Sequence, residues 1–534
     1  MPELQVDGRT VSVPAGSTLL DAAGRLGIPV PTLCFAEGLP HHTSCMVCLV
    51  EDVGADRLVP ACAAQAEEGQ RVRTSGERVG AARRRAIDLL LSEHAGDCEA
   101  PCVRACPAHA DIPGMARRLG RGDLTGALAA MLVRLPLAGS LAAVCPAPCQ
   151  RACRRAGVDS PVAICALKRT AARAGLGAAA GAAGAAPYTP AAAPPNGKRV
   201  AVVGAGPAGL SAAYFLSLAG CRCTVIDQAD GPGGLLRRAV PTERLPADLF
   251  DADVALLTRL GVELHSGESV APGDRLADLR ERYDALVLAT GSVETREELL
   301  GHESAVDPGT GATDLPGVFA GGNAARKPPT RMAVRAVADG RMAAGSVISF
   351  LAGSRPLPLP RRFDSRRGAM RPEDLALLAG DAEDRAARVR RAPARPSPTS
   401  EEMSREARSA LEAAAAEAFR CLDCGCSRGQ TCILRSLAEE WGADGRCFPR
   451  DGAPAFERLR GKGGLSFEPG KCVRCGICVR VAERGGDRPG LAFTGRGAEA
   501  RVRVPFGGDI GEALPATASE CVARCPTGAL AWDR

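Results

Sequence analysis

The stretch that decides the fold class is residues 198–227, KRVAVVGAGPAGLSAAYFLSLAGCRCTVID. It begins with a short apolar run typical of a buried strand, continues through a glycine-rich turn into an apolar helical segment, and ends in a second apolar run. Gly204, Gly206 and Gly209 follow the first run, where a dinucleotide pyrophosphate needs close backbone approach and a helix N-terminus. Asp227 closes the second run, where a carboxylate can accept from a ribose hydroxyl. The sequence therefore predicts a Rossmann-like dinucleotide-binding fold.

Three further segments complete this domain: DGPGGLLRRAVPTERLP, YDALVLATGS and LPGVFAGGN. They resemble the FAD signatures of the glutamate synthase small subunit. The resemblance implies that FAD is held by Gly204, Gly206, Pro207, Ala208, Gly209, Asp227, Gly234, Leu235, Gly291, Gly322 and Asn323. That family has aspartate at the position of Asn323, so a hydrogen bond to the ribityl chain is retained here while a charge is removed.

Only 25 residues, 292–316, separate the last two signatures. In many flavoprotein reductases a whole nicotinamide-binding domain occupies this interval. One βαβ unit already takes about 30 residues, and the chain contains no second glycine-rich fingerprint. We therefore expect a flavin domain without its nicotinamide module, reduced through clusters or by a partner and not by NAD(P)H bound to this chain.

The 23 cysteines predict metal chemistry. They occur in groups of four, seven, two, five and five, separated by cysteine-free sequence. Secreted disulfide proteins instead concentrate cysteines in one small domain. The pattern indicates iron–sulfur sites in a reducing, cytoplasmic compartment. Cys221 and Cys223 lie at the start of the second apolar run of the dinucleotide fold, and we interpret this pair as packing residues.

The first group comprises Cys34, Cys45, Cys48 and Cys62. Four thiolates complete two tetrahedral irons, and a C-x2-C pair offers two sulfurs from one tight loop. The surrounding sequence resembles the N-terminal [2Fe–2S] domain of the large iron–sulfur subunit of complex I; a zinc site is the alternative.

Upstream of these cysteines, apolar and polar residues alternate over 3–13 around an Asp-Gly turn, which predicts a β-hairpin. Ser17 is the expected N-cap of the helix that follows.

The second group lies in two segments that resemble the helical two-cluster domain of the glutamate synthase small subunit and dihydropyrimidine dehydrogenase. In that family, cysteines of both segments interleave around two [4Fe–4S] clusters. By this resemblance, the ligands of one cluster are His94, Cys98, Cys102 and Cys153. The ligands of the other are Cys106, Cys145 and Cys149, with Cys165 close to the position of the fourth.

The His94-x3-Cys98 spacing matches the opening of a cluster motif in the complex I subunit. His94 is therefore either a cluster ligand, since imidazole can replace thiolate on iron, or a cap at the end of a helix.

The C-terminal cysteines predict two more sites. The first has the spacing C-x2-C-x-C-x5-C and suits either [4Fe–4S] or zinc: Cys421, Cys424, Cys426 and Cys432. The second matches the bacterial ferredoxin pattern, with the fourth ligand from a distant Cys-Pro: Cys472, Cys475, Cys478 and Cys525. Ala482 stands where a second ferredoxin cluster would need a cysteine, so one [4Fe–4S] cluster is expected here. The chain would hold three [4Fe–4S] clusters, or four if the Cys421 group binds iron.

These patterns predict a multidomain α/β and α+β protein. The expected segments are a β-grasp [2Fe–2S] domain (1–80), an α-helical two-cluster domain (81–173), a linker (174–197), an FAD-binding Rossmann-like domain (198–352), a second linker (353–400), a helical cysteine-rich segment (401–450) and a ferredoxin-like domain (451–534). A charged fraction of 24% and a net charge of +6 indicate a globular chain without a nucleic-acid surface. No apolar run is long enough for a membrane span, and no signal layout opens the chain.

We expect an oxidoreductase of the electron-transfer type, relaying electrons between clusters and FAD for another redox subunit (dehydrogenase, hydrogenase or diaphorase) or a soluble ferredoxin. No nucleophile–base constellation is present in the sequence, so no catalytic residue is assigned. Two alternatives remain open. One is a self-contained NAD(P)H-dependent reductase of the glutamate synthase type. The other is a redox sensor or scaffold.

Overall fold

The computed structural model describes residues 1–177, 186–271, 274–330, 332–358, 362–391, 405–445, 447–448 and 456–533. Parts of the two predicted linkers, 178–185, 359–361 and 392–400, lie outside the described residues. Residues 401–404, 446 and 449–455 of the predicted C-terminal segments also lie outside them.

The chain forms two compact units, each built from segments far apart in the sequence. Unit 1 comprises Met1–Glu99, Arg361–Asp374 and Gly425–Arg534. Unit 2 comprises Ala100–Pro360 and Leu375–Cys424. This division corrects two predicted boundaries, because the expected domain 81–173 is divided after Glu99 and the expected segment 401–450 after Cys424. Residues adjacent in sequence thus enter different cores.

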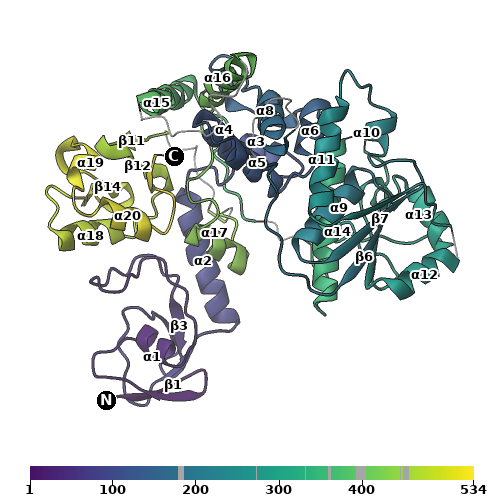
Figure 1. The fold of residues 1–534 in the computed structure, drawn as a ribbon. Coiled ribbons are helices and arrows are strands. Elements are labelled where there is room, and N and C mark those ends of the chain that lie inside the picture. Colours follow the sequence, from purple (N-terminus) through teal and green to yellow (C-terminus); the bar gives the residue numbers. More distant parts are fainter. Residues whose placement is uncertain are drawn as a thin grey trace. The chain divides into compact units, whose positions relative to one another are not determined.

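The N-terminal part of unit 1 is a five-stranded sheet in the order β2-β1-β5-β3-β4 (Figure 1). Its strands are β1 (Glu3–Val6), β2 (Arg9–Ser12), β3 (Leu49–Asp52), β4 (Arg57–Pro60) and β5 (Arg71–Arg73). The predicted hairpin joins β1 and β2, and Asp7 and Gly8 both take positive φ there, as a two-residue turn of this kind requires. Helix α1 (Leu19–Arg25) is capped by Thr18, in a capping box with Asp21, and not by Ser17 as predicted.

The remainder of unit 1 surrounds the C-terminal cysteines. Its helices are α2 (Glu77–Glu93), α17 (Ile433–Trp441), α18 (Ile477–Gly485), α19 (Ile510–Ala513) and α20 (Ala518–Arg524). Its strands are β11 (Leu459–Arg460), β12 (Leu465–Phe467) and β15 (Leu530–Trp532) in one antiparallel sheet, and β13 (Ala492–Thr494) and β14 (Arg501–Arg503) in another. Helix α2 packs on α17, so residues before and after unit 2 in sequence share one core.

Unit 2 begins with short helices, many of them separated by cysteine-containing turns. They are α3 (Pro101–Ala105), α4 (Ile112–Gly120), α5 (Leu124–Leu132), α6 (Ala138–Val144), α7 (Pro148–Arg151) and α8 (Ile164–Leu176). Helix α16 (Arg405–Phe419) returns to pack on α4 and α8. The predicted second linker contains α15 (Pro372–Arg391), a 20-residue helix. The Arg and Pro content suggested a linker, but part of this segment is a helix. Its inward residues, such as Leu378, are buried.

The predicted Rossmann-like part of unit 2 has five parallel strands in the order β10-β9-β6-β7-β8. They are β6 (Arg199–Val203), β7 (Arg222–Asp227), β8 (Glu263–Ser266), β9 (Ala285–Leu288) and β10 (Val318–Ala320). Alternate residues of β6 enter different cores, with Val200 and Val202 in one and Ala201 and Val203 in the other. This is the pattern of a parallel sheet covered on both faces.

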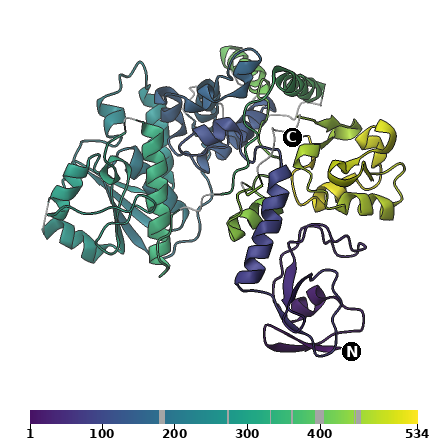
Figure 2. The ribbon, with the colours of Figure 1, turned by 180° about the vertical axis from the view of Figure 1, so that it is seen from behind.

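Helices cover the two faces of this sheet (Figure 1). α9 (Pro207–Leu218), α11 (Ala247–Arg259) and α14 (Ala333–Leu351) lie on one face, and α12 (Asp274–Arg282) and α13 (Val293–Leu300) on the other. Figure 2 shows the long α14 beside the strands from behind. A Cβ at Gly340 of α14 would lie 2.1 Å from the Ala208 carbonyl oxygen, so glycine allows α14 to approach α9 closely. Short helix α10 (Leu235–Arg238) follows β7.

Candidate iron–sulfur and dinucleotide sites

Four buried cysteines meet beside the N-terminal sheet, three on the loop before β3 and one after β4: Cys34, Cys45, Cys48 and Cys62. Their thiols are joined by hydrogen bonds, from Cys34 to Cys45 and Cys62 and from Cys48 to Cys62. The bond with Cys62 lowers the pKa of Cys48 to about 7. Four converging sulfurs with this spacing fit a two-iron centre.

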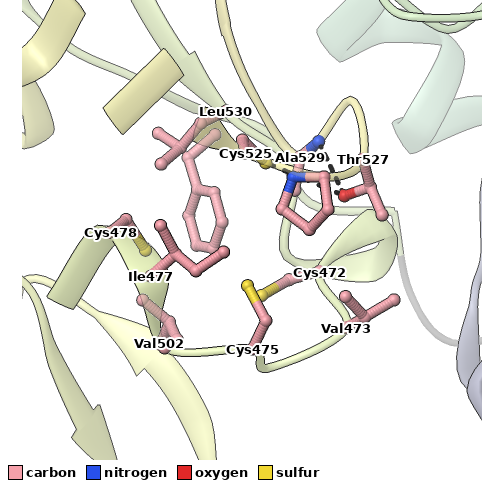
Figure 3. Close-up of a pocket in the computed structure, with 13 residues that line it drawn as sticks. Cys472, Val473, Cys475, Ile477, Cys478, Val502, Cys525, Thr527, Ala529 and Leu530 are labelled. Carbon is pink, nitrogen blue, oxygen red and sulfur yellow. Dashed lines mark hydrogen bonds between the residues drawn. The ribbon is translucent and has the colours of Figure 1, made fainter. Parts of the chain in front are cut away.

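The predicted ferredoxin cysteines line one pocket of unit 1 (Figure 3). They are Cys472, Cys475, Cys478 and Cys525. The sulfurs of Cys472 and Cys475 lie side by side, and apolar residues such as Ile477, Val502 and Leu530 complete the wall. Burial raises the pKa of Cys475 to about 12, so this thiol stays neutral until a metal displaces its proton. The pocket fits a four-iron cluster.

Cys521, the remaining cysteine of this segment, has a different role. It is fully buried, and its thiol donates to the Cys478 carbonyl oxygen at 3.6 Å. The Thr517 hydroxyl lies 3.7 Å from its sulfur. Cys521 thus supports the backbone of a predicted ligand.

A third set of cysteines in unit 1 joins two segments that are 328 residues apart in sequence, at Cys98 and Cys426. The backbone N–H of Cys426 donates to the Cys98 carbonyl oxygen at 3.3 Å. Burial, with a contribution from the neighbouring Cys426, raises the pKa of Cys98 to about 12, against a backbone hydrogen bond from Ser365 and the charge of Arg435. Burial and then Cys426 also raise the pKa of the Cys432 thiol. Cys98, Cys426 and Cys432 therefore face a common region.

Arg435 on α17 holds this region together. It is 1% exposed and donates to the carbonyl oxygens of Gly429 and Phe363, both at 2.6 Å. It also pairs with Glu99, next to Cys98, at 3.0 Å. All three segments of unit 1 meet at this guanidinium. His94, predicted as either ligand or cap, is the C-cap residue of α2, with its N–H donating to the Leu91 carbonyl oxygen.

Unit 2 contains a fourth set, drawn from three places in the sequence: Cys102, Cys153, Cys421 and Cys424. Burial raises the pKa of Cys102 far above its usual value, and the neighbouring Cys421, Cys424 and Cys153 raise it further. Burial, with Cys421 next, raises the pKa of Cys424 to about 12. Arg117 on α4 pairs with Asp423 at 2.6 Å and so fixes the Cys421–Cys424 turn.

The structure therefore regroups two predicted ligand sets. Cys98 belongs to unit 1, whereas Cys102 and Cys153 belong to unit 2. The C-x2-C-x-C-x5-C group is likewise divided, Cys424 to unit 2 and Cys426 to unit 1. The physical reason is that the chain passes from unit 1 to unit 2 after Glu99 and, following its short return through Arg361–Asp374, passes back to unit 1 at Gly425.

A fifth set lies near the start of unit 2: Cys106, Cys145, Cys149 and Cys165. A hydrogen bond with Cys165 lowers the pKa of Cys145 to about 6, and burial opposes this change. Burial raises the pKa of Cys149 to about 11, and Cys106 and Cys145 contribute to that increase, against Lys168. Cys165, predicted to lie near the fourth-ligand position, is thus beside a predicted ligand.

The glycine-rich turn after β6 forms an open cradle. A Cβ at Gly204 would lie 2.4 Å from the Ala289 carbonyl oxygen, and one at Gly209 would lie 1.9 Å from the Gly204 carbonyl oxygen. A Cβ at Gly206 would meet nothing within 4 Å, as would one at Gly291 beyond β9. The N-terminus of α9 follows Gly206 directly. Free space beside a helix N-terminus at the carboxyl end of a parallel sheet fits a pyrophosphate.

The remaining predicted nucleotide contacts have structural partners. Asp227 accepts from the backbone N–H groups of Ala205 at 2.6 Å and Ala229 at 2.8 Å. Asn323, expected to bond the ribityl chain, exchanges two hydrogen bonds with the backbone of Thr330. Cys221 and Cys223 are 6% and 0% exposed in the core under β7, which agrees with their interpretation as packing residues.

Residues 289–317, all described, connect β9 to β10. They contain α13, of eight residues, and a turn in which Ala312 pairs with Phe319 across an isolated bridge. The buried Arg296 donates to the carbonyl oxygens of Ala324 and Ser304 and fixes this connection to the sheet edge. The connection leaves no room for a second nucleotide-binding domain.

Three parts of the chain match protein-family models. Residues 2–77 match a 2Fe-2S iron–sulfur cluster binding domain, and residues 92–177 match domain II of dihydropyrimidine dehydrogenase, a 4Fe-4S cluster domain. Residues 202–257 match an NAD(P)-binding Rossmann-like domain. The predicted iron–sulfur and dinucleotide folds are confirmed at this level. With the converging thiols, they define the class of chain by its folds: iron–sulfur cluster domains joined to a dinucleotide-binding Rossmann-like domain.

The curated relatives similar to this chain are named as subunits of oxidoreductases. The NADP(+)-dependent formate dehydrogenase subunit beta of Moorella thermoacetica is 37% identical over 207 residues, 36% of this chain and 29% of the relative. The NADPH-Fe(3+) oxidoreductase subunit beta of Geobacter sulfurreducens is 35% identical over 195 residues, 36% of this chain and 28% of the relative. The NAD-dependent dihydropyrimidine dehydrogenase subunit PreT of Escherichia coli is 32% identical over 213 residues, 38% of this chain and 49% of the relative. The matched parts therefore span half or less of each relative's length.

Among the helices that the structure describes, none combines the length and apolar character needed to cross a membrane.

Proposed function

We propose that this chain is an electron-transfer subunit of a redox complex, relaying electrons between iron–sulfur clusters and FAD for a partner dehydrogenase or hydrogenase. The observation that carries this proposal is the shared core of unit 2. Cys102 and Cys149 pack in the same hydrophobic cluster as β6, α9 and α14 of the nucleotide fold. Two polar contacts reinforce it: Tyr214 Oη donates to the Leu132 carbonyl oxygen, and Arg341 donates to the Ala108 carbonyl oxygen.

The proposed ligand sets follow the thiols that converge. One [2Fe–2S] centre is held by Cys34, Cys45, Cys48 and Cys62. Two [4Fe–4S] clusters in unit 2 are held by Cys102, Cys153, Cys421 and Cys424, and by Cys106, Cys145, Cys149 and Cys165. Two more in unit 1 are held by Cys472, Cys475, Cys478 and Cys525, and by Cys98, Cys426 and Cys432 with His94 as the fourth ligand.

FAD, when bound, would exchange electron pairs with carriers that accept one electron at a time. Within that role, Gly206 and the N-terminus of α9 bind the pyrophosphate, and the open backbone at Gly291 admits the rest of the cofactor. Asp227 orients the glycine turn through its two backbone bonds. The catalytic centre for the oxidised or reduced substrate would lie on another chain.

The family match of residues 202–257 favours a second candidate, in which NAD(P)H itself occupies the fold and the chain acts as a reductase. The names of the relatives from Moorella and Geobacter include NADP(H). The short connection between β9 and β10 counts against binding both nucleotides in this chain.

An anaerobic titration of the purified protein distinguishes these candidates. NADH, then NADPH, and finally dithionite are added while flavin and cluster absorbance are followed. The electron-transfer proposal expects tightly bound FAD, no bleaching by either nicotinamide, and full reduction by dithionite. Stoichiometric reduction by NADH or NADPH would establish the reductase instead, and a preparation without flavin would exclude FAD from the fold.

A further inference from the structure

Two predicted electron carriers of unit 1 lie on segments more than 400 residues apart. One is the loop that bears Cys34, and the other is the turn that bears Cys475, just before α18. Both cysteines belong to one hydrophobic core. The two sites are therefore near neighbours.

Arg480 on α18 joins these two segments. One terminal nitrogen of its guanidinium donates to the Cys34 carbonyl oxygen at 2.9 Å and to the Cys475 carbonyl oxygen at 3.1 Å. The other terminal nitrogen donates to the Pro40 carbonyl oxygen, and Nε donates to the Gly476 carbonyl oxygen at 3.2 Å. A single side chain thus bonds the backbone of one predicted ligand from each centre.

Two more arginines of the same surface contact the Cys34 loop without contacting a predicted ligand. Arg484, one turn further along α18, donates to the Gly38 carbonyl oxygen at 3.4 Å. Arg524 of α20 donates to the Glu37 carbonyl oxygen at 3.0 Å. Both also pair with Glu520, so a neighbouring carboxylate compensates their charges. The contacts of Arg480 described above are all with neutral carbonyl groups.

An aromatic pair also packs between the Cys34 loop and the C-terminal part of unit 1. His42 stacks on Phe493 with ring centres 5.4 Å apart and an interplanar angle of 25°. Gly476 lies beneath them, and a Cβ there would stand 3.1 Å from the His42 ring and 3.2 Å from the Phe493 ring. Its positive φ of 68° also suits glycine. The close approach of the two loops therefore depends on a residue without a side chain.

We propose that Arg480 is a positioning residue that couples the [2Fe–2S] centre at Cys34 to the [4Fe–4S] centre at Cys475, so that electrons pass directly between them. The inference rests on the proposed function, because it requires both centres to be loaded. In the step, the reduced two-iron centre loses one electron and the oxidised four-iron centre gains it. No bond is broken and no proton is transferred. The path through Arg480 consists of two hydrogen bonds between the ligand backbones.

The charge of Arg480 gives it a second effect. A guanidinium remains protonated at all working pH values, and hydrogen bonds and charge near a cluster tune its reduction potential. An added electron makes a cluster more negative, so a nearby cation stabilises the reduced form. Since Arg480 contacts both ligand backbones, it raises both potentials together.

The test compares the full chain with three variants: Arg480→Gln, Arg480→Lys and the matched control Arg484→Gln. Redox titration followed by electron paramagnetic resonance gives the potential of each centre and their magnetic interaction. In the unmodified protein, the two reduced centres should broaden each other's signals. Arg480→Gln should lower the reduced-to-oxidised ratio of both centres about tenfold at a fixed applied potential, equivalent to about 59 mV for one electron. Arg480→Lys, which keeps the charge, should restore most of it, and Arg484→Gln should change neither potential.

Normal potentials in Arg480→Gln, or a shift in only one centre, would overturn the proposal. Absence of magnetic interaction in the unmodified protein would also overturn it, even if Arg480→Gln failed to load its clusters. The nicotinamide titration above does not involve Arg480. If that titration contradicts the proposed function while both potentials shift together, the function fails and the coupling stands.

Discussion

Asp253 on α11 shows how one buried carboxylate organises a neighbouring helix. It is fully buried and accepts from the backbone N–H groups of Gly139 and Ser140 and from the Ser140 hydroxyl, at 3.2, 2.6 and 2.6 Å. It therefore satisfies the N-terminus of α6, which leads into the Cys145 turn. Burial raises the pKa of Asp253 to about 6, although the three donors oppose that change.

This pKa predicts a pH dependence of stability. The unfolded chain deprotonates near its ordinary carboxyl pKa and the folded chain only near 6, so the free energy of unfolding falls as pH rises across that window, by up to about 3 kcal/mol. Asp253→Asn keeps an acceptor and removes the titration. The difference in Tm between the unmodified protein and this variant should favour the unmodified protein more at pH 5 than at pH 7. An equal difference at the two values would contradict the assignment.

A substitution at Gly206 should affect nucleotide binding without affecting folding. Because a Cβ there meets no protein atom within 4 Å, Gly206→Ala should fold normally but occupy space needed by the pyrophosphate. We expect flavin content to fall at least tenfold with unchanged iron content. Gly380→Ala, also in open space but on α15, is the matched control and should retain its flavin. Full flavin in Gly206→Ala would place the cofactor elsewhere.

At the scale of elements, the packing of the adjoining helix determines which unit each cysteine-bearing turn belongs to. Helix α16 packs on α4 and α8 and delivers Cys421 and Cys424 to unit 2. Helix α17 packs on α2 and keeps Cys432 in unit 1. The single residue Gly425 between the two groups marks the change of unit, and no spacing rule for cysteines contains that information.

Iron counts in double variants test this sorting. If Cys102 and Cys421 share a cluster, each single Ser substitution should remove about four irons, and the double variant should remove no more than either. The Cys98→Ser and Cys102→Ser double variant should lose about eight, because the two residues belong to different clusters. If the Cys98→Ser and Cys102→Ser double variant instead lost only about four irons, and the Cys102 and Cys421 double variant lost about eight, Cys98 and Cys102 would share a cluster, as their closeness in sequence predicts.

The junction at Arg435 supports a prediction of its own. Removing the guanidinium leaves Glu99 without this partner in a partly buried site and frees the Gly429 and Phe363 carbonyl groups, at a cost of about 3 kcal/mol or more. Arg435→Met should therefore lower Tm and remove about four irons, those of the Cys98, Cys426 and Cys432 set. Arg428→Met, on the same loop, is the control: this half-exposed arginine donates to the carbonyl oxygens of Ala523 and Cys525, so its loss should leave the Cys98, Cys426 and Cys432 set loaded. Unchanged iron in Arg435→Met would show that the junction is not needed to hold the metal.

At the scale of the whole molecule, the two segments of unit 2 alternate along the chain with the three segments of unit 1. The chain completes unit 1 only after residue 425, so the Cys98 set forms after unit 2 has been synthesised. With five ligand sets, we expect about 18 irons per chain by colorimetric analysis of anaerobically purified protein. About 14 would mean that one four-iron set is empty, and zinc in the same sample would identify a structural metal in its place.

The dinucleotide fold, the N-terminal hairpin, and the ferredoxin and two-iron ligand spacings could all be predicted from the sequence. Each depends on residues close together in the chain, such as Gly204 to Gly209 or Cys472 to Cys478, and local geometry is encoded locally. The helix in residues 372–391 was missed because its small and charged residues resemble those of a linker. Its few buried positions can be recognised only when the surface on which the helix packs is known.

The sequence by itself determined which kinds of domain this protein carries: cysteine-rich iron–sulfur domains, and a dinucleotide-binding fold with a glycine-rich turn. Only the tertiary structure decided which cysteines lie together, because metal ligation depends on distance in space, and Cys424 and Cys426, with one residue between them, belong to different units. The same holds for Arg480, whose four carbonyl partners come from segments that the sequence separates by more than 400 residues.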